Sequence, residues 1–309
     1  MPYRLALELD TPDALRACAR EQLEDAVREL REGRADDPVK AVHEARKDVK
    51  KARALLRLAR PGMPRKRYRS ENHALRDAGR LMSGARDAVV LAATAGDLGE
   101  RYPGQLPEAM FEALHARLGA EAAAAHRHEV DDAVEEATGA LEAAVARIEG
   151  WPIDRCDGRT LVAGAVRAYT RGRAALAAAK DEPSVERLHD LRKRVKDLWY
   201  HDRLLEEAWP RVLAAQAKEA HQLSDLLGDD HDLAVLAERL RRGLASDDGK
   251  VVDDDAVLEL IARRRADLQE DAMRLARRLY SERPEAFAGR LGAYVRLGSA
   301  EASRVAEPV

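Results

Sequence analysis

Two stretches of the chain decide its fold, VKAVHEARKDVKK at Val39–Lys51 and VERLHDLRKRVKD at Val185–Asp197, because one is a copy of the other. At a shift of 146 residues their histidines coincide, as do the Arg-Lys and Val-Lys pairs that follow. A second pair, LMSGARDAVVL at Leu81–Leu91 and LLGDDHDLAVL at Leu226–Leu236, matches at a shift of 145 residues. Two matches in the same order at nearly one shift indicate an internal duplication.

Helix start and stop signals divide each copy into four helices. Ser, Thr or Asp before Pro marks a helix start, as at Thr11-Pro12 and Asp37-Pro38, and Gly or Pro marks an end, as at Pro61-Gly62. The expected helices cover about 11–33, 37–60, 64–99 with a kink at 84, 107–148, 157–180, 183–207, 210 to beyond 228, and 254–282, before a short helical tail. We predict an all-α protein of two tandem four-helix bundles, 1–150 and 151–309.

The composition agrees with long helices in a charged, water-soluble chain. Charged residues make up 35% of the sequence and aromatic residues only 4%, whereas a sheet protein would carry more aromatic and β-branched residues. The two cysteines form no CxxC motif, which argues against a disulfide framework or a zinc site. The N-terminus does not read as a signal peptide, and no run of about 18 apolar residues occurs. We expect a cytoplasmic protein with no cofactor.

The net charge of −3 conceals a strong local excess of positive charge. Between Pro38 and Arg69 there are twelve Lys or Arg against two acids, Glu44 and Asp48. On a helical wheel the first copy places basic side chains in one stripe beside an apolar stripe. The basic stripe of the first copy is His43, Arg46, Lys50, Arg53, Arg57 and Arg60, and that of the second is His189, Arg192, Lys196, Trp199 and Arg203.

The positively charged side chains within such a stripe repel one another, and a bound polyanion would relieve this repulsion. A charged helix face is often only a solvated surface, and Lys40, Arg65, Lys66 and Arg67 fit that interpretation. The duplication favours a function for the rest, because a solvated face need not repeat His-x-x-Arg-Lys-x-x-Lys in phase.

At these residues the sequence resembles the CHAD family, the conserved-histidine α-helical domain. HEARKDVKKAR from His43 and HDLRKRVKDLWY from His189 match the basic helices of that family, and GARDAVVL and GDDHDLAVL match its Leu-rich helices. The resemblance covers about Leu5 to Arg296. It implies a module of two four-helix bundles that binds inorganic polyphosphate through basic residues around a groove or pore, and that can associate with polyphosphate granules.

The resemblance also implies which residues bind polyphosphate: His43, Arg46, Lys47, Lys50, Arg53, Arg57, His189, Arg192, Lys193, Lys196 and Arg203, with Arg20 and Arg167 as weaker candidates. The second copy departs from the family, because Trp199-Tyr200 replaces the usual Arg-Tyr pair and Asp197 and Asp202 dilute its charge. We therefore expect the second site to bind less tightly. No fused triphosphatase domain is present in the sequence, so we expect binding without catalysis.

Three other interpretations remain open. His43 and His189 could be catalytic or metal ligands, but no nucleophile repeats beside them. Gly228–Asp232 (GDDHD) is the best metal candidate, yet the first copy keeps only its final Asp, so we expect no metal site. A nucleic-acid binder would use the same basic groove but usually adds aromatic stacking platforms. A helical adaptor could bind a protein partner through the Ala-rich segment 107–148.

Overall fold

A computed structural model describes residues 3–82, 84–126, 130–242 and 254–306. These residues contain helices and no strand, which confirms the predicted all-α class. None of the helices in these ranges is both long enough and apolar enough to cross a membrane.

The helices, in chain order, begin and end as follows. They are α1 Thr11–Arg31, α2 Pro38–Ala59, α3 Arg65–Leu81, α4 Gly84–Arg101, α5 Glu108–His126, α6 Val130–Arg147, α7 Gly158–Asp181, α8 Val185–Leu204, α9 Pro210–Arg241, α10 Asp254–Leu279 and α11 Pro284–Ala306, with short 3-10 turns at Gly33–Ala35, Arg60–Gly62 and Glu206–Ala208.

Side-chain caps mark the starts of α2, α7 and α8. Asp37 accepts a hydrogen bond from the Lys40 backbone N–H at 2.9 Å, at the start of α2. Asp157 and Thr160 form a reciprocal capping box at the start of α7, and Ser184 caps α8. Each cap satisfies a backbone N–H that lacks a partner inside its helix.

The structure corrects three predicted helices. The predicted helix from residue 64 is two helices, α3 and α4, and the predicted helix 107–148 is also two, α5 and α6. In both places the two segments pack in different parts of the molecule, α4 against α5 and α6 against α1 and α3. The short tail is the 23-residue helix α11, because Phe287, Leu291 and Val295 are buried in the core.

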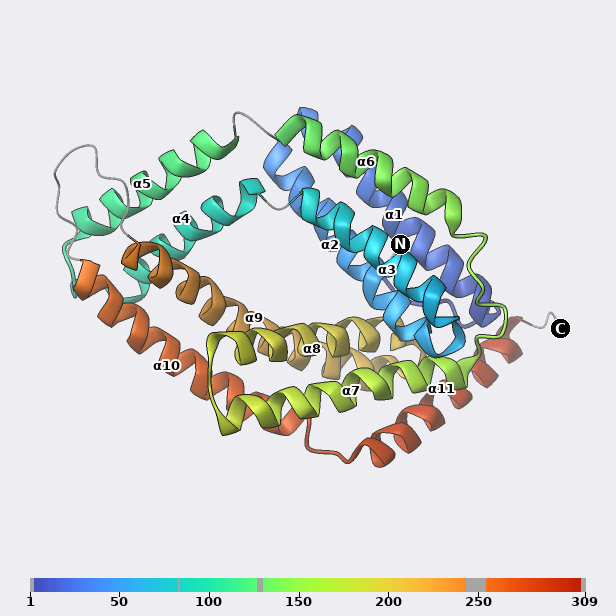
Figure 1. The fold of residues 1–309 in the computed structure, drawn as a ribbon. Helices are drawn as coiled ribbons and strands as arrows, with labels where there is room; N and C mark the ends of the chain where they lie inside the picture. The colour runs from blue at the N-terminus through green and yellow to red at the C-terminus, as the bar shows by residue number, and fades with distance from the viewer. Residues whose placement is uncertain (1–2, 83, 127–129, 243–253, 307–309) are drawn as a thin grey trace.

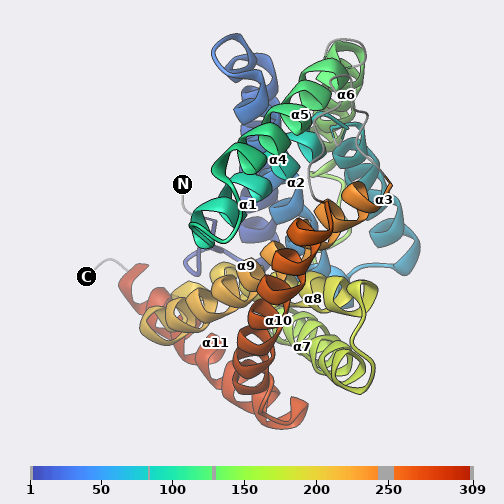
Figure 2. The same cartoon turned by 90° about the vertical axis from the view of Figure 1, so that its left-hand side faces the viewer.

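The helices pack into two hydrophobic cores. The major core joins α1, α2, α3, α6, α7, α8 and α11 with the first half of α9 and the end of α10. The minor core is formed by α4, α5, the second half of α9 and the first half of α10. Figure 1 shows α4 and α5 projecting on the side where α10 begins, and Figure 2 views this side directly. Both cores combine residues from before and after position 150; the boundary 150/151 and the duplication itself stay predictions.

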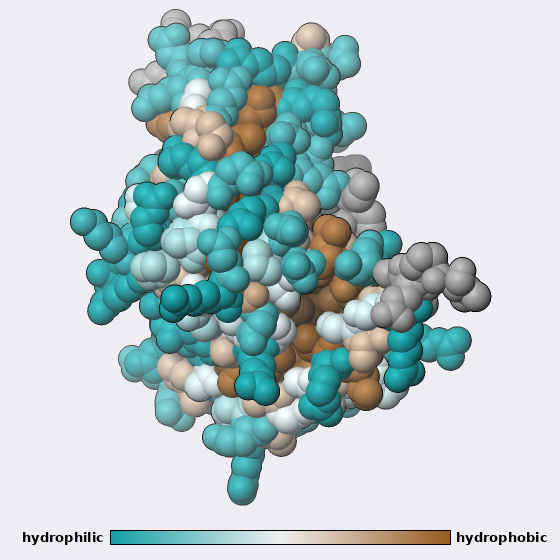
Figure 3. All heavy atoms as spheres, turned by 90° about the vertical axis from the view of Figure 1, so that its right-hand side faces the viewer, coloured by the Kyte–Doolittle hydropathy of each residue, from teal (hydrophilic) through white to brown (hydrophobic). Residues whose placement is uncertain are grey.

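The face of the molecule drawn in Figure 3 is mostly hydrophilic. Figure 3 shows one face of the molecule, on which the C-terminal end lies, with apolar side chains visible in its lower half. The large apolar residues with the most exposed side chains are Leu297 at 57%, Leu9 at 46% and Trp209 at 46%. Trp209 packs edge-on against Tyr294 of α11, with the ring centroids 4.6 Å apart.

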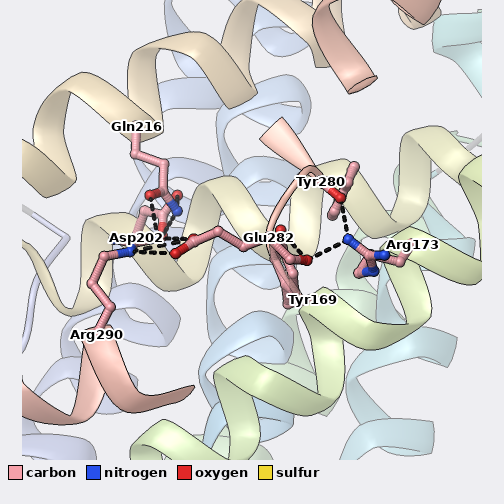
Figure 4. Close-up of polar contacts among 7 residues, drawn as sticks. All are labelled: Tyr169, Arg173, Asp202, Gln216, Tyr280, Glu282 and Arg290. Atoms are coloured by element: carbon pink, nitrogen blue, oxygen red, sulfur yellow. Dashed lines mark hydrogen bonds and ion pairs between the residues drawn. The ribbon is translucent and has the colours of Figure 1, made fainter. Parts of the chain in front are cut away.

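A partly buried polar cluster holds the turn between α10 and α11 in place (Figure 4). Arg173 of α7 donates hydrogen bonds to the backbone carbonyls of Tyr280 and Glu282. Arg290 of α11 pairs with the Glu282 carboxylate at 2.6 Å. Asp202 of α8 belongs to this cluster, because its carboxylate accepts hydrogen bonds from Gln216 of α9, both at 3.1 Å. Burial raises the pKa of Asp202 well above its usual value.

The close contact between α2 and α7 depends on Gly164. A methyl group at this position would overlap the backbone carbonyl of Leu58, and a backbone cannot move aside as a side chain can. We expect Gly164→Ala to lower the free energy of unfolding by about 3 kcal/mol, the upper end for overpacking. Gly139→Ala is the control: it lies in α6 with open space around it, and should raise the free energy by about 0.5–1 kcal/mol. Urea unfolding measures both, and equal effects would contradict the prediction.

His201 makes the fold sensitive to acid. Its buried ring donates from Nε2 to the Ala54 carbonyl of α2 at 3.1 Å, and burial lowers the pKa of His201 to about 4. Below pH 6.5 His201 binds a proton in the unfolded chain, whereas in the folded chain it stays neutral until the pH approaches 4. We therefore expect the free energy of unfolding to fall by up to about 1.4 kcal/mol per pH unit between pH 6.5 and 4, and to be unaffected by His201 at higher pH.

Urea unfolding at pH 7 and pH 5 tests this prediction. His201→Gln keeps an N–H donor and cannot titrate, so this variant should show a smaller difference between the two pH values. An unchanged difference would assign the acid sensitivity to other groups.

Candidate functional site, a cavity lined by basic side chains

A cavity of about 700 Å³ lies where the two basic helices meet. Its walls come from α2 and α8, which carry the repeated stripes, together with α3, α4 and α9; Figure 1 shows these helices around the middle of the molecule. The lining residues are Arg46, Lys50, Arg53, Arg57, Arg76, Arg80, Val90, Leu91, His189, Arg192, Lys193, Arg194, Lys196, Asp197, Tyr200, His231, Asp232 and Val235. We refer to this space as the basic cavity.

Eight of the predicted binding residues line the basic cavity. Four come from α2 and four from α8, so both copies of the repeated stretch contribute to one space. These residues are Arg46, Lys50, Arg53, Arg57, His189, Arg192, Lys193 and Lys196.

Five predicted residues lie outside the lining. His43 and Lys47 belong to α2 but do not line the cavity, and Lys47 pairs with Glu44 at 2.7 Å. Arg203 lies over the Tyr3 and Trp199 rings, with its Cζ 5.5 and 5.9 Å from their centroids.

The two weaker candidates, Arg20 and Arg167, also lie outside the lining. Arg20 of α1 pairs with Glu149. Arg167 is exposed on α7. It lies near Arg171, whose pKa is lowered by burial, then by the Arg194 guanidinium and, to a smaller extent, by the Arg167 guanidinium.

Sequence reasoning missed several lining residues. Arg76 and Arg80 come from α3, and Arg194 comes from α8 outside the repeated stripe. His231 belongs to the Leu-rich motif, in a segment for which the sequence suggested a metal site but no role in binding polyphosphate. Arg76 and Arg80 are one helical turn apart, and that spacing was the available signal.

Neighbouring helices hold the cavity side chains in place. Arg46 donates to the Gly79 carbonyl of α3 at 3.0 Å, and Arg53 donates to Asn72 Oδ1 at 3.2 Å. Arg192 lies against α9 at Gly228, where an added Cβ would be 2.9 Å from its Nη2. The glycine of the Leu-rich motif therefore makes room for a guanidinium.

Positive charge far exceeds negative charge in the basic cavity. Among the lining residues whose side chains the structure describes, ten are Arg or Lys and two are Asp. Burial and then the neighbouring Arg57 guanidinium lower the pKa of Arg53 to about 10, as expected where cations lie close together. An anion in the cavity would relieve the repulsion between these cations.

Asp197 provides the main internal compensation. Its Oδ1 lies 2.6 Å from Arg57 Nε, an ion pair that lacks the alignment of a hydrogen bond, and its Oδ2 lies 3.5 Å from Arg194 Nη1. This buried carboxylate joins α2 to α8. Asp202 was also expected to dilute the charge, but its side chain points into the cluster of Figure 4 and does not line the cavity.

The histidine of the second copy stacks on another histidine. The rings of His189 and His231 lie 4.2 Å apart at an angle of 30°. Burial, followed by His231 and Lys193, lowers the pKa of His189 to about 4, and burial also lowers the pKa of His231. Both rings are therefore neutral near pH 7, and the positive charge of the cavity belongs to Arg and Lys.

Within the GDDHD segment, Asp230 makes its contacts inside the protein. Asp230 accepts from Arg265 Nε at 2.9 Å and from Gln269 Nε2 at 2.7 Å. Across the ranges that the structure describes, no group of three or more His, Cys, Asp and Glu side chains is arranged to hold a metal ion. The side chain of Asp87, the counterpart of Asp232, lies outside the described residues.

Comparisons with known proteins agree with this architecture. A family model described as "CHAD domain" matches residues 17–241. PptA from Streptomyces chartreusis has a similar structure, with a TM-score of 0.61 and 16% identity, covering 89% of this chain and 100% of that one. The CHAD domain from the plant Ricinus communis has a TM-score of 0.57 and 19% identity, covering 92% and 94%. No curated protein matches the chain.

Proposed function

This chain belongs to the CHAD domain family, and on that premise we propose that its basic cavity binds inorganic polyphosphate without catalysing a reaction. The observation that carries the proposal is the charge of the lining, ten Arg or Lys against two Asp. Eight of these cations come from α2 and α8, the two helices that carry the repeated stretch, and two come from α3. A linear polyanion lying between α2 and α8 would meet positive charge on both sides.

The spacing of the cations suits a polymer of phosphate groups. Successive basic residues on α2 are three or four positions apart, so they recur at about every 5.4 Å along the helix. Arg offers a planar fork to phosphate oxygens and Lys a compact charge. Because both residue types hold phosphate without reacting with it, the lining suits a binding function. The setting we propose is the cytoplasm, with association to polyphosphate granules.

The lining is less suited to nucleic acid. Proteins that bind single strands usually stack bases on aromatic side chains. Apart from the histidines, the aromatic residue among the lining residues is Tyr200, which is 4% exposed. Trp199 stacks on Tyr200 with the ring centroids 4.6 Å apart and does not line the cavity. These rings offer no open platform to a base.

A titration with two polymers tests the proposal. The purified protein is titrated with long-chain polyphosphate and with single-stranded DNA of matched total charge, each at two salt concentrations. We expect tighter binding of polyphosphate, with an affinity that falls steeply as salt rises because counterions are released. Equal affinities would make the cavity a general phosphate binder. If neither polymer binds, the proposal is wrong.

A further inference from the structure

We infer that a polyphosphate chain longer than the basic cavity continues along the outside of α3, where Arg65 and Arg69 extend the row formed by Arg76 and Arg80. This external subsite rests on the proposed function of the cavity. We refer to these four arginines as the α3 stripe.

The α3 stripe is one continuous face of the helix. Arg80, Arg76, Arg69 and Arg65 are separated by four, seven and four residues, which keeps them within about 60° of one another at 100° per residue. The buried residues of α3, Tyr68, Glu71, Leu75 and Ala78, lie on a separate face of the helix, whose centre is about 130° from that of the stripe. Arg76 and Arg80 line the cavity, and Arg65 and Arg69 are exposed. From Arg76 to Arg65 the stripe extends about 16 Å beyond the cavity.

A second row of cations accompanies the α3 stripe. Two contacts between α2 and α3 show that the helices are antiparallel: Arg46 with Gly79 and Arg53 with Asn72. Arg60, in the 3-10 turn that follows α2, lies over the Tyr68 ring of α3 at 4.8 Å. The end of α2 that carries Arg57, and the turn that carries Arg60, therefore lie beside the beginning of α3. A polymer leaving the cavity in this direction would stay between two basic rows.

The outer part of the α3 stripe has no acidic partner in the described ranges. Glu71 is buried and pairs with Arg147 Nε of α6 at 3.2 Å, and Asp77 pairs with Arg76 at the cavity end. No acidic side chain in these ranges lies within 4 Å of Arg65 or Arg69. A single exposed arginine is commonly just solvated. The α3 stripe differs because it is continuous with the basic cavity, which is lined by ten cations and two acids.

The test compares short and long ligands on matched variants. Arg65→Gln/Arg69→Gln removes the outer part of the stripe, and Arg67→Gln/Arg304→Gln removes the same charge elsewhere. Arg67 lies two positions from both residues but about 160° around the helix from Arg69, and Arg304 is exposed near the end of α11. Each variant is titrated with tripolyphosphate, which the cavity alone can hold, and with long-chain polyphosphate.

We expect Arg65→Gln/Arg69→Gln to lose about tenfold in affinity for long-chain polyphosphate, as suits two exposed ion pairs, and to keep its affinity for tripolyphosphate. The control should keep both affinities. The subsite would be overturned if Arg65→Gln/Arg69→Gln bound long-chain polyphosphate as tightly as the unaltered chain. It would also be overturned if the control variant lost as much affinity for long-chain polyphosphate, or if Arg65→Gln/Arg69→Gln lost as much affinity for tripolyphosphate as for the long chain. If the unaltered protein binds neither ligand, the proposed function itself fails, and the subsite with it.

Discussion

A chain with Arg46→Ala and Arg192→Ala should bind long-chain polyphosphate at least 100-fold more weakly than the unaltered chain. The two arginines are counterparts in the repeated stretch and face the same cavity from α2 and α8. A hydrogen bond to a charged group is worth about 1.5–3 kcal/mol, so two such losses together reach this size. Titration at fixed salt measures the affinity, and the dependence of log affinity on log salt should become shallower by about 1.4, the loss of two phosphate contacts.

The control for this variant removes two arginines that do not line the cavity. Arg211→Ala/Arg304→Ala makes the same change of net charge, and both side chains are exposed. We expect it to bind nearly as tightly as the unaltered chain. Equal losses in the two double variants would mean that the overall charge, and not the cavity, determines binding.

Replacing Asp197 by Asn should destabilise the protein and strengthen polyphosphate binding. The Asp197 side chain is 6% exposed between Arg57 and Arg194. Without its charge the Arg57 guanidinium remains partly buried and unneutralised near Arg53, whereas Arg194 keeps its ion pair with Asp190. Removing one partner of a buried ion pair costs about 3–5 kcal/mol; we expect a loss of about 3 kcal/mol in the free energy of unfolding. The cavity gains one positive charge, so the affinity for polyphosphate should rise.

Urea unfolding with and without polyphosphate measures both effects. Because a ligand that binds only the folded state stabilises it, polyphosphate should restore more stability to Asp197→Asn than to the unaltered chain. Asp190→Asn is the matched control: Asp190 also pairs with Arg194, at 3.0 Å, but its side chain is 49% exposed. This control should lose less than about 1 kcal/mol. Equal losses, or an unchanged affinity in Asp197→Asn, would contradict the prediction.

The sequence predicted those parts of the fold that depend on local signals. The starts of α1, α2 and α9 coincide with Thr11-Pro12, Asp37-Pro38 and Pro210, where the cap or the proline fixes the first turn. The sequence predicted a kink at Gly84, where α4 begins, but not that α3 and α4 are separate helices, and it did not predict the division α5/α6. Both divisions arise from packing: α4 and α5 belong to the minor core, while α3 and α6 belong to the major core. No local pattern reports which core a helix will join.

The candidate site was predicted where the repeat carries it and missed where other helices supply it. The stripe identified Arg46 and Arg192, because the spacing of three and four residues defines a helix face. Arg80 enters the cavity through the packing of α3 on α2, which the stripe does not encode. The same limitation applied to acids: Asp197 and Asp202 are close in sequence, yet one lies between two cavity arginines and the other is bound by Gln216.

The division into two cores has a consequence for hydrogen exchange. The minor core buries far fewer apolar side chains than the major core, so it should open locally at a lower free-energy cost, and amide protons in α4 and α5 should exchange before those of α2 and α8. The cavity residues Val90, Leu91 and Val235 lie on helices of the minor core. One wall of the cavity therefore belongs to a separately opening unit, and the cavity can widen on that side while the arginines of α2 and α8 stay in place.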